Sequence, residues 1–288
     1  MTNLRMEAAV IFDSFLPEAL RQALYYAGDN GLVASLPQLL HARANAAYDN
    51  IIWNTWFAAN SEESVVRTPL GKHVVVAVHG GGIYASPQRF EQTYRANMNR
   101  SNSQGFTGQY AGKISDREAS DVLEGRLADG SEIPVYTFNE FRQGIAELPR
   151  RYAVVLDFEM VRRTTSGYKT FDDLKDEPLM IVRAGGVGAA AAYLDKARER
   201  HNTMVMGNWH PFNRIDPDQP QTRILFLTGN KGGVGSEDND DHIYGYDADS
   251  GIGGGDCIHN TSMINVARYV AVAPRNESTS VRNLPFNR

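Results

Sequence analysis

Residues 73–98 read HVVVAVHGGGIYASPQRFEQTYRANM, and this stretch decides the fold that we expect. Its first part is a nearly unbroken run of β-branched residues, which is typical of a strand buried on both faces. Three consecutive glycines then end the run, and Ser86-Pro87 restarts the chain in the way that helices begin. The stretch therefore predicts a strand, a glycine turn and a helix, in that order.

Length and composition set the outer limits of the prediction. With 288 residues, of which 42% are hydrophobic, the chain can bury a full core. We expect one α/β domain over residues 1–273, with a helical N-terminal portion at about 13–60, and a polar tail over residues 274–288. A single cysteine, Cys257, excludes an intramolecular disulfide and indicates a reducing compartment, so we expect a cytoplasmic protein. No apolar stretch reaches the ~18 residues that would span a bilayer, so a membrane partner is not expected.

The net charge of −5 is concentrated in one segment. Residues 229–256 hold one glutamate and six aspartates against one lysine, which gives 1 − 7 = −6. No basic stripe with interleaved aromatic residues occurs elsewhere, so a nucleic-acid partner is not expected either. The partner that we expect is a small-molecule substrate, and the sequence does not indicate an oligomeric state.

A second strong strand covers residues 152–159, YAVVLDFE. Asp157 and Glu159 stand two residues apart near its carboxyl end, where they project from one face and where open α/β sheets place their ligands. Two such carboxylates can bind a divalent metal or divide acid and base roles, and a structural strand end is the alternative. The pair resembles the first acidic motif of the DnaQ-like exonucleases, and His242 with Asp247 matches their later spacing. Between these two motifs the chain has no match to the intermediate aspartate motif of that family.

Glycine-rich turns recur later in the chain. Residues 179–182, LMIV, form an apolar run that we expect to be a strand, and Gly186 and Gly188 follow it. The spacing of these two glycines is similar to a dinucleotide-binding fingerprint. Close packing of a helix on a strand is the alternative role for these glycines. Lys231 opens a run that resembles the phosphate loop of MinD/ParA ATPases, but Ser236 stands where that loop needs a lysine, which excludes an ATPase.

Two further groups of residues are candidates for chemistry. His210 precedes a proline, so its backbone is biased to an extended loop, where the imidazole can act as a base or a ligand. Asp240, Asp241 and His242 lie in the acidic segment and can chelate a divalent metal, with a hydrated loop as the alternative. A divalent metal is therefore the candidate cofactor.

The glycine turn itself also resembles a known element. VVVAVHGGG is similar to the oxyanion-hole segment of hormone-sensitive-lipase-type α/β-hydrolases, and the resemblance implies that glycine N–H groups stabilise an oxyanion. The chain has no G-x-S-x-G nucleophile motif, so a serine esterase is excluded. What remains is a turn that can bind an anion or a carbonyl oxygen beside His79.

These patterns together predict an α/β fold, a mostly parallel sheet with helices on both faces and glycine-rich turns at the strand carboxyl ends. The function that we expect is a hydrolase acting on a small polar or anionic substrate with a divalent metal. The alternative is a non-catalytic module that binds a nucleotide or sugar-phosphate. The residues expected to be catalytic are His79, Asp157, Glu159 and His210. Those expected to bind the ligand are Gly80, Gly81, Gly82, Gly186 and Gly188. The expected metal ligands are Asp157, Glu159, Asp240, Asp241 and His242.

Overall fold

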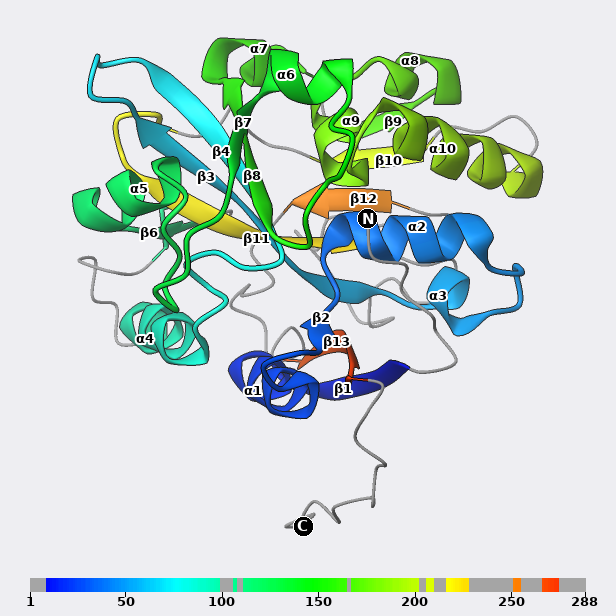
Figure 1. The fold of residues 1–288 in the computed structure, drawn as a ribbon, viewed down its shortest axis with the longest axis horizontal. Coiled ribbons are helices and arrows are strands. Elements are labelled where there is room, and N and C mark those ends of the chain that lie inside the picture. Colours follow the sequence, from blue (N-terminus) through cyan, green and yellow to red (C-terminus); the bar gives the residue numbers. More distant parts are fainter. Residues whose placement is uncertain are drawn as a thin grey trace, which may run out of the picture.

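A computed structural model describes residues 9–98, 106–107, 111–164, 167–201, 206–209, 216–227, 251–254 and 266–274 (Figure 1). Its strands are β1 (Ala9–Phe15), β2 (Leu32–Val33), β3 (Phe57–Arg67), β4 (His73–His79), β5 (Phe106–Thr107), β6 (Ala111–Lys113), β7 (Val135–Thr137), β8 (Tyr152–Asp157), β9 (Gly167–Lys169), β10 (Met206–Trp209), β11 (Gln221–Leu227), β12 (Gly251–Gly254) and β13 (Val266–Val272). Its helices are α1 (Leu16–Ala27), α2 (Leu36–Asn45), α3 (Ile51–Asn54), α4 (Pro87–Met98), α5 (Asp116–Leu123), α6 (Phe138–Gln143), α7 (Phe158–Arg162), α8 (Phe171–Lys175), α9 (Pro178–Ala184) and α10 (Val187–His201).

The large sheet is mixed and mostly antiparallel. Its strand order is β7-β8-β4-β3-β11-β12-β10-β9, with β6 also paired to β11 and β5 to β6. Only β7 with β8 and β10 with β12 run parallel among the described pairs. The prediction of a mostly parallel sheet is therefore wrong.

The main cause of this error is the hairpin of β3 and β4. The two strands pair antiparallel from Ser61 with His79 to Arg67 with His73, and a short turn with Gly71 at φ 81° joins them. A loop of a few residues can only join antiparallel neighbours, whereas a parallel connection needs a crossover of a dozen residues or more. The sequence analysis assigned no strand to residues 57–67, because polar residues interrupt the apolar pattern there.

A second error concerns residues 179–182, which were predicted to form a strand but belong to α9. Pro178 stands in the first turn of this helix, and Gly185 ends it in the left-handed conformation at φ 88°. Proline at the start and glycine just past the end are typical helix boundaries. A short apolar run fits either a strand or a helix, and here the flanking proline and glycine determine that it forms a helix.

Other elements agree with the sequence pattern. Leu16, Leu20 and Leu24 recur every four residues, a spacing typical of a helix, and they belong to α1. The strand expected at 152–159 is β8, which ends at Asp157, and the mostly apolar runs 224–227 and 266–272 lie in β11 and β13. The S-x-x-E pattern of residues 115–118 forms a capping box: the Ser115 hydroxyl accepts from the Glu118 backbone N–H, and the Glu118 carboxylate accepts from the Ser115 N–H.

Two layers cover the large sheet (Figure 1). On one face lie α1, α4, α5 and a small antiparallel sheet of order β1-β13-β2, around a core that includes Leu20, Val78 and Tyr269. On the other face lie α2, α3 and α6 to α10, around two core clusters centred on residues such as Trp53 and Leu156. Both faces of β3 therefore pack against core residues.

No helix in the described ranges is both long and apolar enough to cross a bilayer. The predicted division into a domain over residues 1–273 and a tail over 274–288 stays a prediction, because residues 275–288 lie outside the described part of the chain.

Candidate functional site

Two consecutive glutamates of β3 are the most unusual feature of the described interior. Glu62 is 2% exposed and Glu63 is 1% exposed. Successive side chains of a strand point to opposite faces of the sheet, so the two carboxyl groups enter different layers. Ionisable groups are rarely buried this deeply unless they are paired, and the surroundings of each glutamate therefore need an explanation.

The glycine turn wraps around Glu62. The backbone N–H of Ile83 donates to Glu62 Oε1 at 2.5 Å, and the N–H of Tyr84 donates to Oε2 at 3.0 Å. The turn does present N–H groups to an anion, but that anion is a side chain of the protein. The N–H groups of Ile83 and Tyr84 are therefore already occupied.

Glycine is required at this turn for space as well as for backbone conformation. Gly80 and Gly82 have φ values of 82° and 134°, which favour glycine. A Cβ atom built on Gly82 would lie 2.0 Å from Glu62 Cδ and 2.5 Å from its Cγ, so the buried Glu62 side chain would have to move. Gly82 thus lets the backbone close on the carboxylate.

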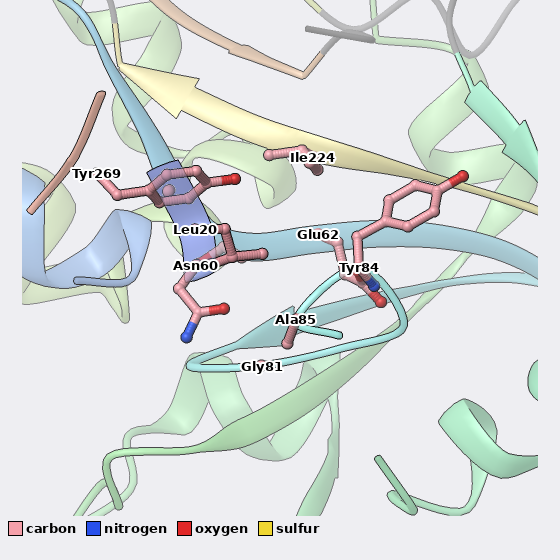
Figure 2. Close-up of a pocket in the computed structure, with 10 residues that line it drawn as sticks. Leu20, Asn60, Glu62, Gly81, Tyr84, Ala85, Ile224 and Tyr269 are labelled. Atoms are coloured by element: carbon pink, nitrogen blue, oxygen red, sulfur yellow. The ribbon is translucent and has the colours of Figure 1, made fainter. Parts of the chain in front are cut away.

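A small pocket, which we call the Glu62 pocket, opens beside this turn (Figure 2). It has room for about one water molecule. Its lining residues come from α1, β3, the glycine turn, β11 and β13: Leu20, Ala59, Asn60, Ser61, Glu62, Gly81, Tyr84, Ala85, Ile224 and Tyr269. The pocket is therefore lined by residues of both sheets. Figure 2 shows the aromatic rings of Tyr84 and Tyr269 at its opposite ends.

Burial raises the pKa of Glu62 from an ordinary 4.5 to about 7, and the two N–H donors only partly offset that effect. Arg89 also favours the charged carboxylate, but this arginine is engaged elsewhere. Its Nε donates to Glu118 Oε1 at 2.5 Å and its guanidinium also donates to the Lys113 carbonyl at 2.9 Å. Glu62 is consequently a buried carboxyl group held by backbone dipoles.

Glu63 has the opposite surroundings. Arg183 of α9 donates to both of its oxygens, at 2.7 and 2.9 Å, and Arg223 of β11 donates to Oε2 at 2.6 Å. Burial alone would raise the pKa of Glu63, but the two guanidinium groups outweigh it and hold the pKa at about 2. The two arginines are 0% and 1% exposed, so this ion cluster ties α9 and β11 to β3 within the core.

His79 belongs to a closed network. The ring is 0% exposed, its Nδ1 lies 2.9 Å from Ser61 Oγ, and its Nε2 lies 3.1 Å from the Val182 carbonyl oxygen. The Leu36 N–H also donates to Ser61 Oγ, at 2.9 Å. Burial lowers the pKa of His79 to about 4, so Nε2–H donates to the carbonyl and Nδ1 accepts from the serine. Every polar atom of the ring therefore has a partner.

The structure does not bring His79 and Asp157 together. Because β4 and β8 are antiparallel, His79 pairs with Tyr152 and Asp157 pairs with Val74. Five residues of strand separate the two positions, which is roughly 17 Å. The expectation that these side chains share one sheet edge is wrong, since the carboxyl ends of antiparallel strands lie at opposite edges.

Asp157 and Glu159 do not share a strand face either. Asp157 caps α7 by accepting from the Met160 N–H at 3.0 Å, and it pairs with Lys72 at 2.7 Å, which lowers its pKa. Glu159 lies inside α7 and pairs with Arg162 on the surface. Their side chains therefore have separate structural partners.

The remaining predicted positions lie apart from the glycine turn or outside the described ranges. Gly186 and Gly188 lie at the start of α10, and nothing lies within 4 Å of a Cβ built on either. His210, Asp240, Asp241 and His242 fall outside the described residues. Within the described ranges no three histidine, cysteine, aspartate or glutamate side chains gather as a metal site would require. The ligand roles of these residues stay predictions.

The sequence analysis missed Glu62, Glu63 and Asn60, although one signal was available. An apolar pair on either side of the polar run, followed by Thr68-Pro69-Leu70-Gly71 and the valine run, is the pattern of a hairpin with a short glycine-containing loop. Once that hairpin is assigned, the two glutamates lie in its central part and need buried partners. The partners of Glu63 lie 120 and 160 positions further along the chain, and those of Glu62 lie 21 and 22 positions further.

Comparison with known proteins identifies the fold. No family model and no curated protein matches the chain. A solved structure described as "Accommodation of massive sequence variation in Nanoarchaeota by the C-type lectin fold" is similar, with a TM-score of 0.61 and 21% sequence identity, over 92% of this chain and 97% of that chain. At this identity the likeness shows the fold, which is the C-type lectin fold.

This fold contradicts the predicted hydrolase. That prediction rested on catalytic residues gathered at the carboxyl edge of a parallel sheet, and neither the sheet nor the gathering is present. The nucleotide or sugar-phosphate alternative also loses its basis at the glycine turn, because the Glu62 carboxylate occupies the N–H groups and repels a phosphate.

Proposed function

We propose that this chain is a non-catalytic module that binds a small molecule or a carbohydrate. The Glu62 pocket carries the proposal, because it offers a buried carboxyl group, the Asn60 amide and the Gly81 backbone beside aromatic rings. The pocket has room for about one water molecule, so it can receive one polar group of a ligand whose remainder lies outside it. The C-type lectin framework supports this reading as an analogy of fold, and fold alone does not fix a function.

The Asn60 side chain is the most available polar group of the pocket. Its backbone is fully used, because its N–H donates to the Ala34 carbonyl and its own carbonyl accepts from Gly80. The side-chain amide makes no hydrogen bond to the described residues and is only partly buried. An amide with both a donor and an acceptor to offer suits the hydroxyl groups of a sugar or a small polar molecule.

At 21% sequence identity to the similar structure, the ligand has to be inferred from this chain's own residues. In the similar protein the same fold accommodates massive sequence variation, so a shared framework does not imply a shared ligand. A panel of immobilised glycans and a library of small polar molecules, screened with the intact chain, tests the proposal. We expect at least one compound to bind and to be recovered chemically unchanged.

Asn60→Ala is the matched variant, because it removes the free amide and keeps the carboxyl group. We expect it to lower the affinity for the ligand by about 10-fold, the loss of one hydrogen bond to a buried group. Conversion of the ligand to a product would contradict the non-catalytic assignment. Failure of every compound to bind would contradict the proposed function as a whole.

A further inference from the structure

Among the residues that the structure describes, Glu62 forms no ion pair, although Arg89 acts on it from further away. Within the described residues, no lysine, arginine or histidine nitrogen lies within the 4.0 Å of its carboxylate that defines an ion pair. Glu63, one residue further on, has two arginines at that distance. Burial without such a pair is why the pKa of Glu62 is raised to about 7, and a cation in the Glu62 pocket would favour its charged form.

The position of such a cation follows from the carboxylate geometry. Each oxygen accepts one backbone N–H, from Ile83 and from Tyr84. A carboxylate has about four lone-pair sites, so two acceptor sites remain. Glu62 is itself one of the residues that line the pocket, so a hydrogen-bond donor in the pocket lies beside this side chain.

The size of the pocket selects among cations. It has room for about one water molecule, which matches a primary ammonium group and excludes a guanidinium or a quaternary ammonium. Tyr84 and Tyr269 line the same space, and an aromatic face attracts a cation. The Tyr84 ring already stacks on Phe90 and lies under the Arg89 guanidinium, so Tyr269 is the aromatic residue to consider. The Asn60 amide oxygen provides a further acceptor, and an ammonium group has three N–H donors to share.

We infer that the Glu62 pocket binds the primary ammonium group of an amine or amino sugar. A hydroxyl group would fit the space but would leave the carboxylate charge unpaired, and an anion would be repelled. This inference rests on the proposed binding function and names the chemical class of its ligand. Glu62 is the specificity-determining residue, because it separates an amino sugar from the same sugar with a hydroxyl group.

Calorimetric titration of the intact chain with matched compounds tests the inference. D-glucosamine, D-glucose and N-acetyl-D-glucosamine share one ring and differ at the nitrogen. Methylammonium and tetramethylammonium separate a free amine from a sugar-borne one and test the size limit. We expect D-glucosamine to bind at least about 10-fold more tightly than the other two sugars, since charge-assisted hydrogen bonds exceed neutral ones.

Three variants locate the effect. Glu62→Gln removes the charge and Ala85→Leu fills the pocket while leaving Glu62 in place. We expect each to lower amine affinity by about 10- to 100-fold. Glu124→Gln, at an exposed carboxylate just after α5 that pairs with Arg126, is the control and should bind as the wild type does. Circular dichroism of each variant shows whether it is folded.

The possible outcomes distinguish a failure of the ammonium site from a failure of the proposed binding function. Tight binding of methylammonium but not of D-glucosamine supports the ammonium site with a free amine as its ligand. Equal binding of D-glucose and D-glucosamine, or amine binding that survives Glu62→Gln, overturns the ammonium site and leaves the binding function standing. No amine binding, together with a glycan or small-molecule ligand that lacks nitrogen, also overturns it.

Discussion

Glu62 and Glu63 are neighbours on one strand and equally buried, yet they differ in what neutralises them. Two arginines hold Glu63 on one face of the sheet, whereas two backbone N–H groups hold Glu62 on the other. The pKa of Glu63 lies at about 2 and that of Glu62 at about 7. A buried carboxylate with complete ionic partners braces a fold, and one without them is available to a ligand.

The largest effect on stability is expected from removing the charge of Glu63, the glutamate that is held by two arginines. Glu63→Gln leaves Arg183 and Arg223 buried without their anion, and we expect it to lower the free energy of unfolding by about 3–5 kcal/mol. Urea melts near neutral pH measure the change. A loss below about 1 kcal/mol would show that the cluster does not hold α9 and β11 in place.

The next effect tests how closely the turn fits Glu62. Gly82→Ala places a methyl group 2.0 Å from Glu62 Cδ at a φ of 134°, whereas Gly144→Ala meets nothing within 4 Å at a φ of 98°. We expect Gly144→Ala to lower the unfolding free energy by about 1–2 kcal/mol from backbone strain alone. Gly82→Ala should lose about 1–3 kcal/mol more through overpacking. Equal losses in thermal melts of the two variants would contradict the close fit.

The pH dependence of stability separates Glu62 from His79. Glu62 has a raised pKa, so its contribution is fully present below about pH 4.5 and is lost as pH rises towards 7. His79 has a lowered pKa, so its contribution is present above about pH 6.5 and is lost as pH falls towards 4. Each effect amounts to about 3 kcal/mol, and in the wild type the two largely cancel.

Single substitutions at Glu62 and His79 separate the two opposing effects of pH on the unfolding free energy. Between pH 4.5 and 6.5, Glu62→Gln should become more stable as pH rises, and His79→Asn should become less stable. The slope of the unfolding free energy against pH is the quantity to compare, since either substitution also disturbs hydrogen bonds. Parallel slopes for both variants would contradict the opposite pKa shifts.

The smallest effect is expected at an exposed carboxylate. Glu159→Gln breaks only the surface pair with Arg162, in which both side chains are about half exposed. We expect a change in unfolding free energy within about 0.5 kcal/mol, because solvent screens such pairs. A larger loss in urea melts would show that burial is not what distinguishes the two β3 glutamates from surface carboxylates.

Local signals predicted local structure well. Ser115 and Glu118 formed their capping box, and the apolar runs became β4, β8, β11 and β13. Strand direction was not predictable from the glycine turns, because a glycine after a strand fits a hairpin, a crossover or a cap. The sequence also presented Asp157 as a strand residue, and its role as the cap of α7 depends on where the helix begins.

The surroundings of Glu62 and Glu63 were not predictable, because both glutamates are held by residues far along the chain. Glu63 meets Arg183 and Arg223 across 120 and 160 residues, and no short motif records such a pairing. The glycine turn was correctly associated with an anion, but that anion belongs to the neighbouring strand. Polar residues inside a strand, here Ser61 to Ser64, are the signal that a buried network exists, although they do not name its members.

Carbon-13 NMR of the glutamate side-chain carboxyl carbons measures the difference between Glu62 and Glu63 most directly, with Glu62→Gln and Glu63→Gln used to assign the two signals. The account predicts that Glu62 titrates near pH 7 and that Glu63 stays ionised at every pH at which the protein remains folded down to about 2. Titration of both groups together near their ordinary value of 4.5 would contradict it.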